Sequence, residues 1–110
     1  MKHEARKYLD DIRKSIEAIE MYTSDLSSVE DYARDAETID AVERRLAIIG
    51  EAVFKINKLN PNLPITEKLR IIKLRHILVH DYDLITHSTI WLIIKNNLPV
   101  LKKQVQDLLA

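Results

Sequence analysis

Residues 75–82, with the sequence RHILVHDY, place one guanidinium, two imidazoles and one phenol in an otherwise aliphatic part of the chain. An arginine holds a phosphate through charge-assisted hydrogen bonds, and a histidine transfers protons near neutral pH. These groups suit cleavage of RNA by the ribose 2′-hydroxyl, since the imidazole moves the protons and the guanidinium stabilises charge on the phosphate. We therefore expect the function of the protein to lie in this stretch.

The positions of Arg75 and His80 on a helix restrict how they can act together. At about 100° per residue, two residues five apart lie roughly 140° apart around a continuous helix, so one copy does not present them side by side. Either the helix unwinds near His80 and Arg75 reaches around it, or two copies of the helix pack together and share one cleft. The second arrangement makes a dimer necessary for activity.

The histidines also have to be considered as metal ligands. His76 and His80 are four residues apart, which is the spacing of a helical two-histidine metal pair. No glutamate follows the first histidine as in the metalloprotease pattern, and His76, His80 and His87 have no obvious third ligand set beside them. We therefore expect no metal site and no cofactor.

The length and composition are those of one small domain. The chain has 110 residues, so residues 1–110 can share a single core, although a partner subunit would help to bury apolar surface. It has no cysteine, which fits a reducing compartment. The first residues are charged and lack the apolar segment of a signal peptide, and no later segment is long enough to span a membrane. We expect a soluble, cytoplasmic protein that does not enter a membrane.

Charge is distributed unevenly along the chain. The 17 basic and 17 acidic residues cancel, which argues against a surface that binds nucleic acid over a broad area. Residues 1–51 carry a net charge of minus five and residues 52–110 plus five, which allows a local anion site in the second half. Lys68, Arg70 and Lys73 precede the motif; they either guide RNA towards it or form an ordinary solvated helix face. The remaining tyrosines are expected to be packing residues rather than base-stacking platforms: Tyr8, Tyr22 and Tyr32.

The pattern of apolar residues predicts an all-α fold, with a single glycine and three prolines to interrupt the helices. Apolar residues at spacings of three and four predict a first helix over about residues 3–22 and a long third helix that includes residues 39–56. Between them, Ser27 or Ser28 is expected to cap a short second helix that carries little of the core.

The second half of the chain contains the clearest helix breakers. Residues 60–64, with the sequence NPNLP, are predicted to form a loop, and Pro64 is expected to begin the fourth helix. A last helix is expected to be capped by Thr86 or Ser88. Pro99 lies within the apolar pattern of this helix and is expected to kink or restart it.

Two features predict close packing around the motif. The fourth helix is apolar over most of its girth, so we expect it to be buried between neighbours or at a subunit interface. Arg75, His76 and His80 interrupt this apolar surface and need partners, because an unpaired buried polar group is strongly unfavourable. Gly50, inside the third helix, is expected to mark a point where another helix packs closely.

Arg75-x4-His80-x-Tyr82 resembles the Arg-x4-His-x-Tyr signature of HEPN-domain proteins, specifically the HepT toxin family, which pairs with MNT-type minimal nucleotidyltransferases. Residues 41–52, with the sequence AVERRLAIIGEA, are similar to the preceding helix of that family. Residues 91–99, which include the single tryptophan and a Leu-Pro pair, are similar to its last helix. The resemblance covers nearly the whole chain.

The resemblance implies an antiparallel bundle of four to five helices that forms a homodimer through the motif helix. The cleft between the copies would be a metal-independent endoribonuclease site, with Arg75 and His80 as the catalytic pair. Tyr82 would be the hydroxyl to which the nucleotidyltransferase adds AMP, and the added bulk and negative charge beside the RNA site would silence the enzyme. The protein would then be the toxin of a type II- or VII-like toxin–antitoxin pair.

Four further residues are candidates for supporting roles. In a common form of the family motif, asparagine follows the arginine, so His76 either replaces the hydrogen bonds of that residue or adds a second proton carrier. Asp81 is expected to face solvent or to bond a neighbouring backbone group. Glu51 and Arg44 either line the cleft or bind the partner, or they are ordinary solvated or salt-bridged residues.

A second function from a different class stays open at this point. The protein could be a non-catalytic helical partner that binds the nucleotidyltransferase or presents a nucleotide to it, so that the motif serves binding alone. The presence of both Arg75 and His80 at the expected spacing favours the ribonuclease, because a scaffold has no need of that pair. Growth arrest on induction, relieved by His80→Ala, would separate the two.

Overall fold

The computed structural model describes residues 2–110, except for the side chain of Tyr82, and within this range it consists of helices and loops without β-strands. The α-helices are α1 (His3–Tyr22), α2 (Val29–Ala33), α3 (Ala36–Leu59), α4 (Lys68–His80), α5 (His87–Leu92) and α6 (Leu98–Leu109). A 3-10 turn, η1 (Tyr82–Leu84), follows α4, and a π-helical segment, η2 (Ile93–Asn97), joins α5 to α6. The predicted all-α class is confirmed, and no helix in the described part of the chain is long and apolar enough to cross a membrane.

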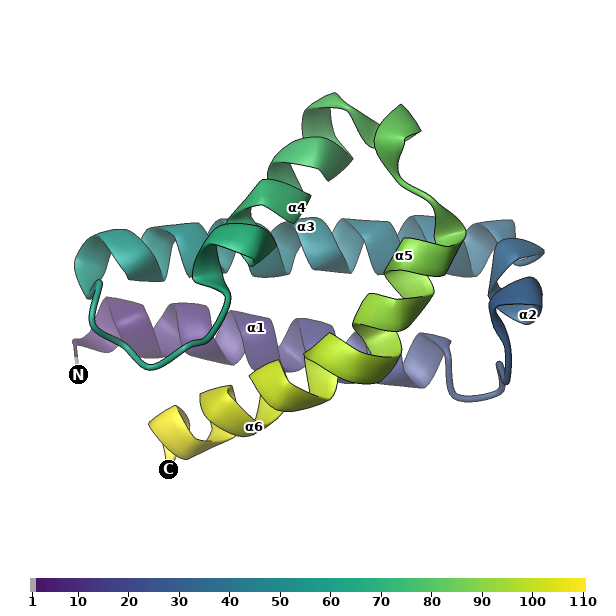
Figure 1. Ribbon diagram of the computed structural model, residues 1–110. Helices are drawn as coiled ribbons and strands as arrows, with labels where there is room; N and C mark the ends of the chain where they lie inside the picture. The colour runs from purple at the N-terminus through teal and green to yellow at the C-terminus, as the bar shows by residue number, and fades with distance from the viewer. Residues whose placement is uncertain (1) are drawn as a thin grey trace.

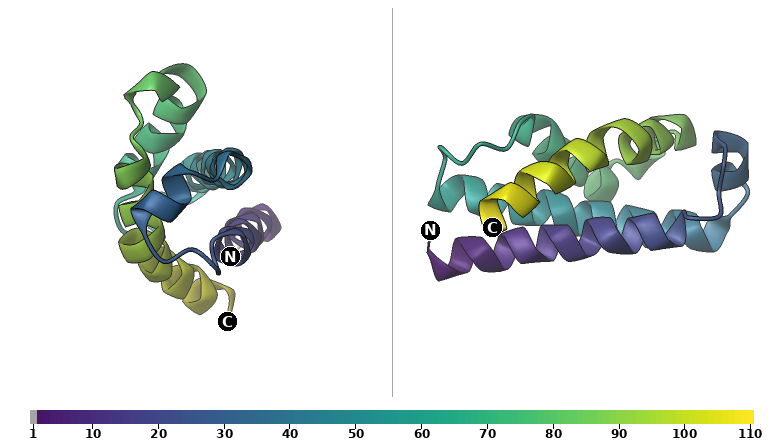
Figure 2. Two further views of the ribbon diagram at one scale, coloured as in Figure 1. Left: turned by 90° about the vertical axis from the view of Figure 1, so that its right-hand side faces the viewer. Right: turned by 90° about the horizontal axis from the view of Figure 1, so that it is seen from below.

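Helices α1 and α3 lie side by side and antiparallel along the length of the molecule, as Figures 1 and 2 show. Helix α4 packs against α3, and α6 packs against α1. The apolar positions predicted from the sequence face inward, because burying them removes apolar surface from water. The buried members of α1 and α3 include Leu9, Ile12, Ile16, Ile19, Val42, Leu46, Ile49, Val53 and Ile56.

Two of the predicted caps begin helices. The side-chain oxygen of Ser28 accepts a hydrogen bond from the backbone N–H of Asp31 at 3.2 Å, and that of Thr86 accepts one from Thr89 at 3.2 Å. Each bond satisfies an N–H group that the first turn of a helix leaves without a backbone partner. The predicted starts of the short second helix and of the last helical run are therefore confirmed.

The start of α4 differs from the prediction. The helix begins at Lys68 and not at Pro64. Ile65 is 4% exposed, and its N–H donates to the carbonyl oxygen of Leu63 at 2.8 Å, so the chain turns to bury this side chain first. Glu67 then adopts a left-handed conformation with φ 60°, outside the helical region. The prediction for Pro64 was wrong because burial of Ile65 outweighs the local preference of proline for a first helical turn.

The last helical run changes geometry beside its proline, as predicted. Helix α5, the π-helical segment η2 and helix α6 follow one another without a loop. Pro99 lies in the first turn of α6, where the missing N–H of proline is not needed for a helical hydrogen bond. The wider turns of η2 absorb the change in direction, since π-helical insertions are a known cause of helix bends.

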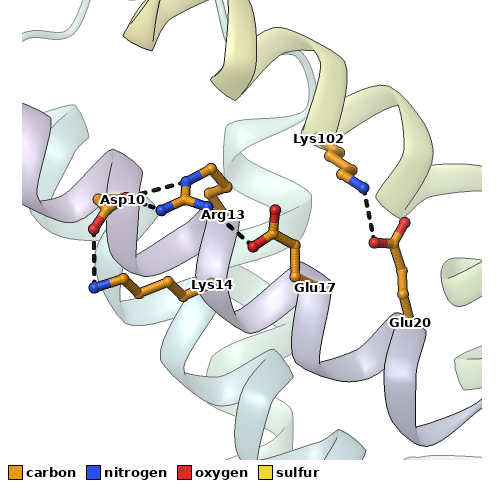
Figure 3. Close-up of polar contacts among 6 residues, drawn as sticks. All are labelled: Asp10, Arg13, Lys14, Glu17, Glu20 and Lys102. Carbon is orange, nitrogen blue, oxygen red and sulfur yellow. Dashed lines mark hydrogen bonds and ion pairs between the residues drawn. The ribbon is translucent and has the colours of Figure 1, made fainter.

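Several ion pairs lie on the surface of α1, and one of them joins α1 to α6 (Figure 3). Asp10 pairs with Arg13 and Lys14, and these cations lower the pKa of its carboxyl group. Lys102 of α6 lies 2.8 Å from the carboxylate of Glu20 in α1. Pairs between such exposed side chains contribute little to stability, so burial of the aliphatic core is the main cause of the packing of α6 on α1.

Candidate active site

The glycine of α3 sets the approach of the motif helix. A Cβ atom added at Gly50 would overlap the Cβ atom of Arg75 and would lie 3.2 Å from the carbonyl oxygen of Ile71. Both of these residues belong to α4. The close helix packing predicted at Gly50 is therefore confirmed, and it presses α4 against α3 at the arginine of the motif.

The residue after this glycine holds the guanidinium of Arg75. The Nε atom of Arg75 lies 3.1 Å from a carboxylate oxygen of Glu51, and the other oxygen of Glu51 lies 3.8 Å from Nζ of Lys55. The side chain of Arg75 is 34% exposed. Because this ion pair uses Nε, the two terminal nitrogens remain open to an anion: neither pairs with another described residue.

Arg75 lies in a hollow of about 350 Å³ that is lined by α1, α3 and α4. Its charged lining consists of four cations and two carboxylates: Lys7, Arg44, Lys55, Arg75, Asp11 and Glu51. Both carboxylates are already paired, Asp11 with Lys7 at 2.7 Å and Glu51 with Arg75. Arg44 is exposed and forms no ion pair with any described residue. The hollow therefore carries excess positive charge and open guanidinium groups, which favours an anionic ligand.

His80 lies outside this hollow. It is the last residue of α4, and its ring centroid lies 4.8 Å from that of His76, one turn earlier. Both imidazoles are exposed, and neither lines the hollow. Helix α4 is continuous up to His80, so it does not unwind to bring His80 beside Arg75. Within one chain, the guanidinium and the imidazole face different surfaces.

The chain leaves helical geometry directly after His80. Asp81 is exposed, and its carbonyl oxygen accepts a hydrogen bond from the N–H of Leu84 at 2.9 Å. The side chain of Tyr82, the expected AMP acceptor, lies outside the described residues. Among the residues that are described, no group of three or more histidine, aspartate or glutamate side chains is placed to hold a metal ion.

Helix α4 is only partly covered within one chain. Seven of its 13 residues are aliphatic, yet none of its described residues is buried. Leu69 is 77% exposed and Val79 is 48% exposed. A second groove, of about 630 Å³, lies between α4 and the run from α5 to α6, and Leu74 and Ile77 contribute to its apolar lining. Exposed apolar side chains on an aliphatic helix are suited to contact with another protein surface.

The basic residues before the motif lie away from Arg75. Arg70 pairs with Glu67 at 2.7 Å, and Arg70 and Lys73 line the second groove rather than the hollow. Lys68 does not line the hollow either. In a single chain, these three cations fit a solvated helix face better than a path that leads RNA to Arg75.

Comparison with known proteins identifies the family. A family model described as ribonuclease HepT-like matches residues 12–108. The chain belongs to the HepT-like ribonuclease family. It is 36% identical over 112 residues, 98% of each chain, to a "Probable ribonuclease HepT" of Thermococcus cleftensis. It is also 34% identical over 109 residues, 96% of each chain, to a protein of Methanocaldococcus jannaschii with a provisional RNase name.

Membership of the HepT-like family confirms the predicted resemblance and the predicted enzyme class, a ribonuclease. The matched region includes α3 and α4, which together hold Arg75 in the hollow. No solved structure gives a significant match to the chain.

Helix α1 contributes to the hollow of this HepT-like protein in a way that the sequence does not indicate. Lys7 and Tyr8 line it, although they lie far from the motif in the sequence. Tyr8 was expected to be a packing residue, and its side chain does pack against the core. Its ring also lies 5.6 Å from Nζ of Lys7 and 5.5 Å from Nζ of Lys55. No local spacing indicates this arrangement, because it arises from the packing of α1 and α4 on the same helix.

Proposed function

We propose that this HepT-like ribonuclease cleaves RNA without a metal ion, in a homodimer cleft where Arg75 of one copy meets His80 of the second. The observation that carries the proposal is the separation of the two groups on one continuous helix. Arg75 lines the hollow, whereas His80 is exposed to solvent outside it. Two copies of α4 related by a two-fold axis can supply one group each. Exposed Leu69 and Val79 offer apolar surface for that contact.

The proposed reaction is an internal transesterification of the RNA backbone. The ribose 2′-oxygen attacks the adjacent phosphorus and the bond from phosphorus to the 5′-oxygen breaks, leaving a 2′,3′-cyclic phosphate and a 5′-hydroxyl. His80 takes the proton of the 2′-hydroxyl, and the 5′-oxygen gains a proton from a second imidazolium or from water. The terminal nitrogens of Arg75 bind the non-bridging oxygens as negative charge grows on them.

Glu51 has a positioning role in this proposal. Its carboxylate lies 3.1 Å from Nε of Arg75 and so fixes the direction in which the guanidinium points. A guanidinium held in advance loses less conformational freedom when it binds the phosphate. Arg44, which lines the same hollow without a partner among the described residues, is available for a neighbouring phosphate.

We further propose that the protein is the toxin of a toxin–antitoxin pair in the cytoplasm and that a minimal nucleotidyltransferase silences it through Tyr82. The phenolic oxygen attacks the α-phosphorus of ATP, pyrophosphate leaves, and the phenolic proton passes to a base of the partner or to water. Tyr82 follows His80 by two residues. An adenylate there adds bulk and negative charge next to the imidazole, and both oppose binding of an RNA phosphate.

Cleavage by the purified chain tests the ribonuclease. A fluorescent RNA oligonucleotide is incubated with the protein in the presence of a chelator, and the ends of the products are identified by mass spectrometry. We expect 2′,3′-cyclic phosphates, and we expect Arg75→Ala and His80→Ala each to lower the rate by at least about a hundredfold. Arg34→Ala and His3→Ala are matched controls, since both change exposed residues outside the hollow. Equal loss of activity in the controls would contradict the assignment.

Expression in cells tests the toxin and its silencing. Induction without a partner should arrest growth, and His80→Ala should relieve the arrest. A wild-type chain that leaves growth unaffected would instead favour the non-catalytic helical partner. Incubation with the nucleotidyltransferase and ATP should add the mass of one adenylate, and Tyr82→Phe should abolish that addition. Modification that persists in this variant would refute Tyr82 as the acceptor.

A further inference from the structure

The wall of the hollow opposite the motif helix contains an aromatic ring that the proposed reaction does not use. Tyr8 of α1 lines the same hollow as Arg75 of α4. Its phenol ring is partly buried against the core, which fixes its position. The volume of the hollow, about 350 Å³, falls at the lower end of the range of about 300–1,000 Å³ that small-ligand sites occupy. This size fits one nucleotide of a longer strand.

The charges around Tyr8 point to the kind of ligand. The ammonium groups of Lys7 and Lys55 lie 5.6 and 5.5 Å from its ring centroid. Lys55 is 47% exposed, and its contact with Glu51 is long, at 3.8 Å. A flexible lysine can leave the ring and follow a phosphate, because its contact with an exposed aromatic face is weak. Sites for single-stranded nucleic acid combine an aromatic platform with cations along the backbone, and this hollow contains both.

We propose that Tyr8 stacks the nucleobase next to the scissile phosphate, while Lys55 and Arg44 bind the flanking phosphates. The subsite rests on the proposed ribonuclease function, because it takes Arg75 as the ligand of the scissile phosphate. Its substrate class is single-stranded RNA, since the faces of bases inside a duplex are covered by the stacked neighbouring base pairs. An aromatic ring stacks on every base, so the subsite accepts all four.

Binding of an uncleavable RNA measures the subsite directly. The full chain is titrated with a fluorescent 2′-O-methyl trinucleotide, and the dissociation constant is read from the anisotropy. We expect Tyr8→Leu to weaken binding by about five- to a hundredfold, the range that the loss of one base stack gives. Tyr8→Phe keeps the ring and should bind as the wild type does. Tyr22→Leu, a change of the half-buried tyrosine at the other end of α1, is the control and should also bind normally.

A second pair of variants tests the subsite without altering a packed side chain. Lys55→Glu and Lys58→Glu change exposed residues of the same helix and shift the net charge equally. Lys55 lines the hollow, whereas Lys58 does not and lies over the ring of Phe54, 4.4 Å from its centroid. We expect weaker binding for Lys55→Glu alone. Equal weakening by both would mean that only overall charge matters, and together with normal binding by Tyr8→Leu it would overturn the subsite.

Cleavage of unmodified RNA separates the subsite from the proposed function. If the wild type cleaves and Tyr8→Leu has the same kcat/KM and the same trinucleotide affinity, the subsite is wrong and the ribonuclease stands. If the wild type binds the trinucleotide with the expected dependence on Tyr8 but cleaves no RNA, the subsite stands and the ribonuclease proposal fails. If both activity and affinity fall in Tyr8→Leu and survive in Tyr8→Phe, both stand.

Discussion

The contact between Gly50 and Arg75 allows a quantitative test of how the fold positions the guanidinium. In Gly50→Ala the new Cβ atom would overlap the Cβ atom of Arg75, which the backbone of α4 fixes in place. The two helices would have to separate locally by on the order of 1 Å. Alanine favours a helix interior over glycine by about 1 kcal/mol, but overpacking a close contact costs about 1–3 kcal/mol. We therefore expect a net loss of about 1 kcal/mol in the free energy of unfolding.

Urea unfolding at a fixed protein concentration measures this loss, and calorimetry should show a Tm lower by about 4–8 °C. The double variant Gly50→Ala with Arg75→Gly is the matched control, because glycine at position 75 removes the overlapping Cβ atom. In a chain that already carries Arg75→Gly, the loss in the free energy of unfolding caused by Gly50→Ala should be smaller by about 1–2 kcal/mol, a coupling energy typical of residues in contact. RNA cleavage by Gly50→Ala should also fall, since Arg75 moves. A Gly50→Ala protein that is more stable and equally active would show that the close contact at Gly50 does not position Arg75.

Three further substitutions give expected outcomes at single side chains. Tyr32 is fully buried, and its hydroxyl has no hydrogen-bond partner among the described residues. Tyr32→Phe should therefore raise the free energy of unfolding, measured by urea titration, by about 1 kcal/mol. A lower free energy of unfolding in this variant would show that the hydroxyl does have a partner. Burial and the nearby charge of Asp40 raise the pKa of Glu43, so the folded state binds the carboxyl proton of Glu43 more tightly than the unfolded state does. The free energy of unfolding should then fall as the pH rises from the pKa of Glu43 in the unfolded state, about 4.3, through its higher pKa in the folded state. Glu43→Gln should accordingly raise Tm at pH 7 and match the wild type below about pH 4; a difference that persists at low pH would contradict this cause. Glu51→Gln should change stability little, since exposed ion pairs contribute at most about 1 kcal/mol. It should slow RNA cleavage, because Arg75 loses the carboxylate that orients its guanidinium. An unchanged kcat for RNA cleavage would show that Glu51 has no role in the site.

The helices themselves were predictable because their apolar residues recur at spacings of three and four. Ile12 and Ile16 of α1 and Leu46 and Ile49 of α3 are buried as this pattern requires. The start of α4 was not predictable from local signals. It depends on the burial of Ile65 in the core, which is a tertiary effect that the local sequence does not contain.

The site was predictable to the extent that its residue types are unusual for their surroundings. Arg75 and His80 were singled out because aliphatic helices rarely carry such groups, and the single glycine predicted the contact that places Arg75. Tyr8 and Lys7 were missed, because their role follows from the way α1 and α4 flank α3. The exposed face of α4 was anticipated as buried or as an interface, and one chain leaves it uncovered.

A mixed dimer shows whether Arg75 and His80 act from different copies. An Arg75→Ala chain and a His80→Ala chain, each inactive alone, are expressed together with different affinity tags, and the mixed dimer is purified through both. If one copy supplies the guanidinium and the other the imidazole, this dimer has one intact site of two, and its rate should be about half that of the wild type. A mixed dimer as inactive as its two parents would show that both groups act within one chain and that no site is shared between the copies.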